Sequence, residues 1–340
     1  MEALHILVTA TNAVLPIVLL ILLGYWLKQI GFLSADFVKT GNKLVFNVCL
    51  PCMLFVNVYD IEGFESISWD IVIYSVAMVF VIFLMGLAIA LITTKQPKRR
   101  GSMCQATFRS NMAIIGLSLA SALGGNEAVA VAAIVSAFTV PVFNILAVFA
   151  LTMFCSEDGK GKVDFKKILL NIAKNPLIIS IGLGMVCLVI RVVQKSLFGE
   201  PVFLLKDIQF LYKALNNLKS IASPFALLVL GGQFAFSAVK ALWKEIVTGT
   251  LSRIVLAPLV GIGCAILLSS MGVISCGVNE YPALIALFGS PTAVSSAVMA
   301  GQMGADEQLA TQLVVWTSIG SIFTVFGTVC ALMAMGLLAV

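Results

Sequence analysis

Ten stretches of the sequence run for more than fifteen residues without a Lys, Arg, Asp or Glu. They are 3–27, 44–59, 71–94, 110–126, 128–156, 175–190, 220–239, 254–279, 281–305 and 308–340. A bilayer core is about 30 Å thick, and a helix of roughly 20 apolar residues crosses it. The chain is 60% hydrophobic and 11% charged, whereas soluble domains carry about 25% charged residues. The sequence therefore predicts an integral membrane protein.

The spans are expected to be helices. Strands of membrane barrels alternate apolar and polar residues over about ten positions, but the stretch 71–92 is apolar on every face. A helix also satisfies its own backbone polar groups where no water is available. We predict an all-α fold of ten transmembrane helices. The first is too long, and lacks the basic start, for a removable signal peptide.

The basic residues predict the orientation. Sixteen of the 21 lie in the odd-numbered links between spans, and the other five all lie between Arg191 and Lys219. Because basic links stay in the cytoplasm, both termini are expected outside. The 191–219 link is an exception, and we interpret its residues 201–215 as an amphipathic approach to helix 7 at the membrane interface.

The chain divides near its middle. A glycine-containing charged loop, 155–164, leaves five spans on each side. We expect a first repeat over 1–154, a cytoplasmic linker over 155–167 and a second repeat over 168–340. A shift of 180 residues aligns AxFxSxxA at 106–113 with the same pattern at 286–293. Since each half has an odd number of spans, the repeats are expected to be inverted, as in many secondary transporters.

Helices 4 and 9 carry polar groups and helix breakers at equivalent central positions. These are Arg109, Ser110 and Asn111 in one and Ser290, Pro291 and Thr292 in the other. Proline interrupts a helix, and Ser or Asn caps a new one. We predict two broken helices whose second halves begin at Asn111 and Pro291. Their N-termini would attract a carboxylate. The alternative is a simple kink with serine hydroxyls bonded to the preceding turn.

Other polar and helix-breaking residues are expected to support this site. Arg109 either attracts an anion or snorkels to the headgroups. Arg253 either ties helix 8 to carbonyl groups at a break or contacts substrate. Asn47 and Gln233 are expected to bond between helices, and Pro51 and Pro224 stand in mid-span at corresponding places of helices 2 and 7.

The sequence gives little indication of disulfides, metal sites, catalysis or ion coupling. Eight cysteines scattered singly and a lone His5 predict neither disulfides nor a metal site. No catalytic constellation, cofactor motif or nucleic-acid motif appears, so an enzyme is not expected. Every Asp and Glu lies in a link or at a span end. Coupling to sodium or protons therefore leaves no signature in the sequence.

The stretches 42–58, FRSNMAIIGLSL at 108–119 and 290–326, with PFALLVLGGQF at 224–234 and SRIVLAPLVG at 252–261, resemble the auxin efflux carrier family. This family belongs to the bile-acid, arsenite and riboflavin transporter superfamily. The resemblance implies a scaffold domain from helices 1, 2, 6 and 7. It implies a transport domain from helices 3–5 and 8–10 that moves like an elevator, with helices 4 and 9 crossing at the substrate.

The resemblance also assigns residues. Asn111 matches the family's carboxylate-binding asparagine, and Pro291 matches its crossover proline. Ser110 departs from the proline of plant carriers, and Arg109 is not a feature that we assign to the plant pattern. The short loop at 155–174 favours a bacterial inner membrane, and a homodimer is expected by analogy alone.

The sequence thus predicts a secondary transporter that moves a small organic anion, a mono- or dicarboxylate such as malate, malonate or an auxin-like acid, across the lipid bilayer. The alternative is a membrane-embedded sensor or partner subunit that binds a ligand without moving it.

Overall fold

The computed structural model describes residues 2–60, 69–154, 170 and 173–338, and within them every regular element is a helix. The expected linker at 155–167 lies outside the described residues. The first half holds α1 (Glu2–Gln29), α2 (Ala35–Leu44), η1 (Val45–Cys49), α3 (Leu50–Tyr59), α4 (Trp69–Thr93), α5 (Pro97–Phe108), η2 (Met112–Gly116) and α6 (Leu117–Phe154). The second half holds α8 (Pro176–Phe198), η3 (Leu205–Asp207), α9 (Gln209–Gln233), α10 (Ser237–Ala241), α11 (Trp243–Leu251), η4 (Ser252–Leu256), α12 (Ala257–Ser270), α13 (Glu280–Leu284), η5 (Ile285–Gly289), α14 (Ser295–Gln302) and α15 (Glu307–Ala334).

Six helical stretches of the described chain are long and apolar enough to cross a membrane. They are Ala35–Tyr59, Trp69–Thr93, Leu117–Phe154, Pro176–Phe198, Trp243–Ser270 and Glu307–Ala334. The all-α membrane class is therefore confirmed, while ten spans in two inverted repeats stay a prediction. The two numbers differ partly because interrupted helices yield short pieces, and because α9 begins with a stretch, 209–219, in which polar residues interrupt the apolar ones.

Two local irregularities let long apolar segments bend. In α6, Gly124 and Gly125 have non-helical backbone angles, and Gly125 adopts φ +64° and ψ −154°, a conformation that only glycine occupies readily. In the second span, the π-helical turn η1 directly precedes Pro51 at the start of α3. A wide turn there accommodates the missing N–H of the proline.

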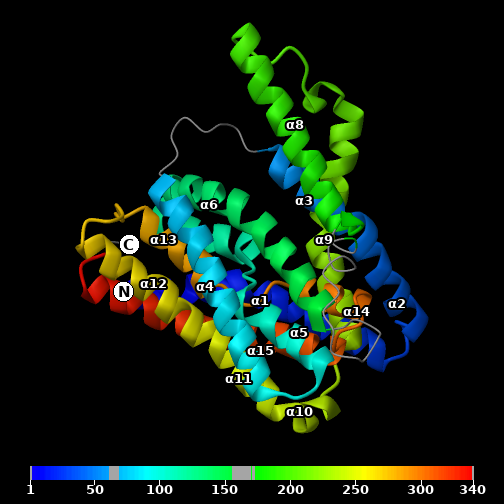
Figure 1. Ribbon diagram of the computed structural model, residues 1–340. Helices are drawn as coiled ribbons and strands as arrows, with labels where there is room; N and C mark the ends of the chain where they lie inside the picture. The colour runs from blue at the N-terminus through cyan, green and yellow to red at the C-terminus, as the bar shows by residue number, and fades with distance from the viewer. Residues whose placement is uncertain (1, 61–68, 155–169, 171–172, 339–340) are drawn as a thin grey trace.

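The helices form two packed groups (Figure 1). In one, α3 packs against α8 and α9, and α2 packs against α9. In the other, α4, α5 and α6 pack together with α11 to α15. Helix α1 contacts both groups, because it packs against α9 on one side and α15 on the other. Helix α1 therefore lies at the boundary between the two groups, where α14 also contacts α2 and α9.

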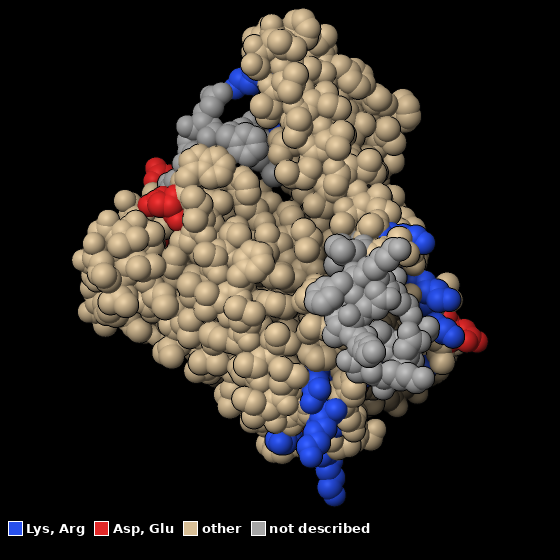
Figure 2. All heavy atoms as spheres, viewed as in Figure 1, with Lys and Arg blue, Asp and Glu red and all other residues tan. Residues whose placement is uncertain are grey.

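Charged side chains are unevenly distributed (Figure 2). Most visible Lys and Arg side chains gather at the lower and right-hand sides, where α2, α10 and α11 lie in Figure 1. The larger group of visible Asp and Glu side chains lies at the upper left. This separation of charge agrees with a multi-pass membrane protein.

Helices α1 and α9 approach each other through glycines. A Cβ at Gly24 would lie 2.1 Å from the carbonyl oxygen of Leu228, and a Cβ at Gly231 would lie 2.1 Å from that of Ile21. Small residues allow helices in lipid to pack backbone against backbone. This contact holds α1 to the α3, α8 and α9 group.

We predict that Gly231→Ala lowers the free energy of unfolding by about 1–3 kcal/mol, since the added methyl group overpacks the α1–α9 contact. Thermal unfolding in detergent measures the effect. The matched control is Gly182→Ala in α8, where a Cβ meets nothing within 4 Å. Equal melting temperatures for the two variants would contradict the close contact.

Candidate functional site

Two interrupted helices cross in the centre of the molecule. After α5 ends at Phe108, residues 109–111 leave the helix before η2 begins at Met112. After η5 ends at Gly289, the chain leaves the helix until α14 begins at Ser295. The two irregular segments form one antiparallel bridge between Ser110 and Thr292. The Asn111 N–H donates to the Pro291 carbonyl at 2.9 Å, and the Ala293 N–H donates to the Arg109 carbonyl at 3.1 Å.

The second half of the later helix begins farther along the chain than expected, at Ser295 instead of Pro291. The reason is that the intervening residues bond across the crossing. The Thr292 N–H donates to Thr317 Oγ1 at 3.1 Å, and Thr292 Oγ1 donates to the Ala106 carbonyl at 2.9 Å. The earlier helix resumes at Met112, one residue after the expected Asn111.

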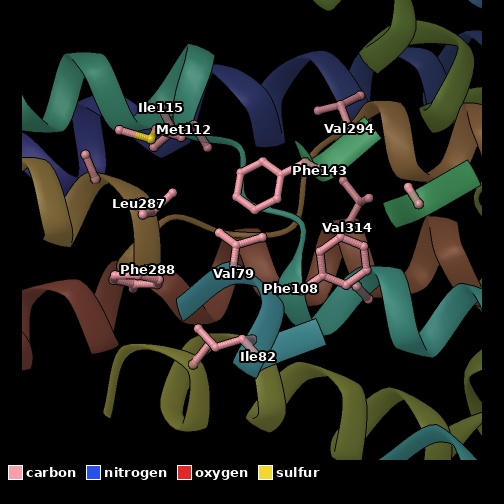
Figure 3. Packing of buried hydrophobic residues seen from close by; sticks show 14 of the residues in the cluster. Val79, Ile82, Phe108, Met112, Ile115, Phe143, Leu287, Phe288, Val294 and Val314 are labelled. Atoms are coloured by element: carbon pink, nitrogen blue, oxygen red, sulfur yellow. The ribbon is translucent and has the colours of Figure 1, made fainter. Parts of the chain in front are cut away.

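An apolar shell surrounds this crossing (Figure 3). The Phe108 ring lies 5.3 Å from that of Phe83 and 6.2 Å from that of Phe143, measured between centroids. Figure 3 shows Met112 and Ile115 beyond one break and Leu287 and Phe288 before the other. Such surroundings exclude water and strengthen electrostatic interactions inside.

Arg253 joins the C-terminal ends of both first half-helices. Its side chain is 1% exposed. Its guanidinium donates to the carbonyl groups of Thr107 and Phe108 at 3.3 Å, of Leu287 and Phe288 at 2.9 and 3.2 Å, and of Ser290 at 2.7 and 2.9 Å. A helix C-terminus carries partial negative charge, so one cation neutralises two converging ends.

The N-terminal ends of the second half-helices have no such counter-charge. The first N–H groups of a helix lack acceptors within it, and no backbone hydrogen bond of the described residues engages the N–H groups of Ala113, Val294 or Ser295. Two buried side-chain atoms beside them, Ser110 Oγ and Asn111 Nδ2, also have no hydrogen-bond partner in the described chain. Unpaired buried donors are costly, so these groups are available to bind an acceptor in the adjoining cavity.

Arg109 adds a full positive charge at the same place. Its side chain is 3% exposed, so it does not snorkel to the headgroups. Its Nη2 donates to Asn144 Oδ1 and its Nη1 to Met299 Sδ, both at 2.7 Å. None of the described ion pairs includes Arg109. Neither contact neutralises the guanidinium, which is expensive to bury without a negative partner.

Two neighbouring cavities lie beside these groups. The inner cavity measures about 40 Å³ and is lined by Leu50, Met53, Leu54, Arg109, Ser110, Asn111, Ala113, Val140, Phe143, Asn144, Ala222, Ser223, Ala226, Ala293, Val294 and Ser295. The outer cavity measures about 770 Å³ and is lined by Pro16, Ile17, Leu20, Met53, Asn57, Ala113, Ser118, Ala122, Lys219, Ser220, Ser223, Pro224 and Leu227. Met53, Ala113 and Ser223 line both. The two cavities therefore adjoin each other, and the outer one is large enough for a small organic acid.

The remaining residues singled out by sequence lie outside the inner cavity. Ser290 and Thr292 are fully buried in the crossing. Asn47 is exposed and bonds within its own helix to the Lys43 carbonyl. Pro51 lies in α3 beside Leu50, and Pro224 lines the outer cavity.

Gln233 takes part through its backbone in a group of hydrogen bonds at the end of α9. Its carbonyl accepts from Gln308 Nε2 at 2.7 Å, and the Ala235 carbonyl accepts from Gln312 Nε2 at 2.8 Å. Asn42 Nδ2 donates to Glu307 Oε1 at 2.7 Å. These three contacts join α2 and the end of α9 to the start of α15, on the side of the crossing away from Lys219.

Sequence reasoning did not identify Asn144 or Ser223. Asn144 holds the Arg109 guanidinium, and Ser223 lines both cavities. The available signal for Asn144 was a single amide in the otherwise apolar stretch 141–151. Ser223 had no comparable signal, because serine is common in membrane helices.

The fold and the crossing define the class of the protein as a polytopic helical membrane protein with interrupted helices. The membrane transport protein family matches residues 9–329, and the chain belongs to that family. This confirms the resemblance to the auxin efflux carriers.

Individual relatives agree with this assignment. An uncharacterized transporter of Methanothermobacter thermautotrophicus is 22% identical over 322 residues, covering 92% of this chain and 95% of the relative. An uncharacterized transporter of Methanocaldococcus jannaschii is 26% identical over 233 residues, covering 67% and 70%. Among solved structures, the sodium proton antiporter MjNhaP1 of Methanocaldococcus jannaschii shares the fold with a TM-score of 0.59 and 12% identity, covering 96% of this chain and 97% of the antiporter.

We predict that Arg253→Met lowers the free energy of unfolding by about 3 kcal/mol or more, since carbonyl groups at both breaks lose a charged donor. Arg253→Lys should recover only part of the loss, because an ammonium group lacks the planar fork of a guanidinium. Thermal unfolding measures both. Arg100→Met is the control, as the Arg100 Nε donates to one carbonyl, that of Thr94, away from the crossing. A melting temperature of Arg253→Met equal to that of Arg100→Met would contradict the role of Arg253.

Proposed function

We propose that the protein is a secondary transporter for a small organic anion carrying one or two carboxylates. The supporting observation is the imbalance of charge at the crossing. Two C-terminal helix ends face Arg253, whereas two N-terminal helix ends and the Arg109 guanidinium face a cavity without a carboxylate among its described lining residues. An anion in the inner cavity would neutralise the positive charge of the two helix ends and of Arg109.

The proposed binding mode assigns a role to each group. The Arg109 guanidinium pairs with the carboxylate, and Asn111 Nδ2 and Ser110 Oγ donate to its oxygens. The free N–H groups at Ala113 and Ser295 add helix-terminus charge. Leu50, Met53 and Phe143 surround the apolar part of the anion. Pro291 and Thr292 act indirectly, because they fix the crossing that aims these donors.

The walls of the cavities support movement by an elevator. On one side they come from α1, α3 and α9, and on the other from the crossing, α6 and the start of α14. The anion thus lies between the two packed groups of helices. In this proposal the group of α4 to α6 with α11 to α15 carries the anion past a scaffold of α1 to α3, α8 and α9.

We further propose that this conformation faces outward. In this proposal α2, α10 and the end of α9 lie on the cytoplasmic side, as the basic links favour, and the three contacts of Asn42, Gln308 and Gln312 close the path there. The outer cavity opens toward Lys219 and Asn57, at the opposite ends of α9 and α3. On this orientation both termini are extracytoplasmic, in a bacterial inner membrane.

A cation as sole substrate is less well supported. Although the neighbouring fold is that of a sodium proton antiporter, neither cavity has a carboxylate among its described lining residues. A cation would meet Arg109 and two partially positive helix ends. Coupling of anion movement to sodium or protons remains compatible with the proposal.

We predict that Asn111→Ala lowers carboxylate uptake into proteoliposomes at sub-saturating concentration by roughly tenfold or more, since a hydrogen bond to a charged group contributes about 1.5–3 kcal/mol. The control is Asn47→Ala, which removes an amide exposed outside both cavities. Thermal unfolding verifies that both variants fold.

Two results would contradict the proposal. Equal uptake by Asn111→Ala and Asn47→Ala would place the anion elsewhere. Saturable carboxylate binding by the wild-type protein, with no flux in proteoliposomes under any gradient, would favour a sensor that binds without transport.

A further inference from the structure

We propose that Lys219 is an entry site for the carboxylate, where the anion binds at the outer mouth before it reaches Arg109. This inference rests on the proposed function and adds a second anion position to it. Lys219 is the one charged residue among the described residues that line the outer cavity. It belongs to a cluster at the extracytoplasmic ends of α3 and α9, which we call the Asp60 cluster, made of Asp60, Lys206, Tyr212 and Lys219.

The Asp60 cluster has more positive than negative charge. One carboxylate, that of Asp60, is shared by Lys206 Nζ at 3.4 Å and Lys219 Nζ at 3.5 Å. Tyr212 OH also donates to Asp60 Oδ1, at 2.7 Å. Charge-assisted hydrogen bonds are normally about 2.7–2.9 Å long. Both lysines are therefore loosely held, and Asp60 cannot neutralise both.

Lys219 is free to exchange partners. Its side chain is 31% exposed and that of Asp60 is 28% exposed. Partly exposed pairs of this kind contribute little to stability, so replacing the Asp60 carboxylate with that of an incoming anion costs little. Asp60 would then still be held by Lys206 and Tyr212.

Lys219 also lies on the same face of α9 as a residue that lines the inner cavity. Ser223 follows it by four residues on α9, which places both on one helix face. Ser223 lines both cavities, and the inner cavity ends at Asn111 and Arg109. A carboxylate thus meets two cations in series, Lys219 in the wide chamber and Arg109 in the narrow one.

Anion attraction would also give a role to the unusual charge of the link that contains Lys219. The extracytoplasmic links of the predicted topology are otherwise without Lys or Arg, yet five basic residues lie between Arg191 and Lys219. Basic residues there oppose the preferred orientation. Attraction of an anion to the outer mouth is a function for which this charge is suited.

The test measures carboxylate uptake, as KM and kcat, in three variants at low and high ionic strength. Lys219→Gln should raise KM by roughly tenfold at low ionic strength with little change in kcat, and the effect should shrink in high salt. Asp60→Asn should lower KM, because Lys219 loses its competing carboxylate. Lys213→Gln is the control, since it makes the same charge change on the same helix at an exposed residue in none of the described ion pairs.

The opposite changes of KM expected for Lys219→Gln and Asp60→Asn distinguish a binding role of Lys219 from a structural one. If Lys219 only stabilises the fold through Asp60, both Lys219→Gln and Asp60→Asn break the pair and impair uptake alike, which overturns the proposal. Equal KM values for Lys219→Gln and Lys213→Gln overturn it as well. Absence of carboxylate transport by the wild-type protein would instead refute the proposed function on which this inference rests.

Discussion

The guanidinium of Arg253 holds the centre of this protein together. Two helices stop in the buried centre of the protein, at Phe108 and Gly289, and a stopped helix leaves carbonyl groups without partners inside it. Arg253 donates to carbonyl groups at both stops, and the bridge between Ser110 and Thr292 pairs the backbone where the two segments cross. Once the C-terminal ends are satisfied in this way, the two second half-helices begin beside a shared cavity. The geometry of the proposed binding site therefore follows from the way in which the backbone of the two breaks is satisfied.

The charges of the crossing explain why an anion is the proposed substrate. A helix end carries roughly half an elementary charge, and among the described residues a compensating group lies at one pair of ends only. The other pair, with Arg109 beside it, is left positive in an apolar shell that contains Phe108 and Phe143. In the proposed cycle, this positive cavity alternates between two sides of the membrane, and bound carboxylate neutralises it during the passage.

Much of this arrangement could be predicted from the sequence. The long stretches without charged residues identified the membrane class. Polar and helix-breaking residues at equivalent positions, near residues 110 and 290, located both breaks. Details that depend on contacts between distant segments could not be predicted. The helix after Pro291 resumes at Ser295 because Thr292 bonds to Thr317 and Ala106, and no local pattern encodes those partners. Likewise, the burial of Arg109 depends on Asn144, which lies thirty-five residues away in the chain, and Gln233 contributes a carbonyl group where a side chain was expected.

The central claim is that a carboxylate binds between the starts of the two second half-helices. The most direct measurement is a crystal structure of the protein with a bromine-substituted small carboxylic acid, using the anomalous signal of bromine to locate the ligand. The account predicts a peak in the cavity bounded by Arg109, Asn111 and Ser295, with the carboxylate within hydrogen-bond distance of Asn111 Nδ2. A ligand bound with its carboxylate away from both breaks, while the inner cavity holds only water, would contradict it.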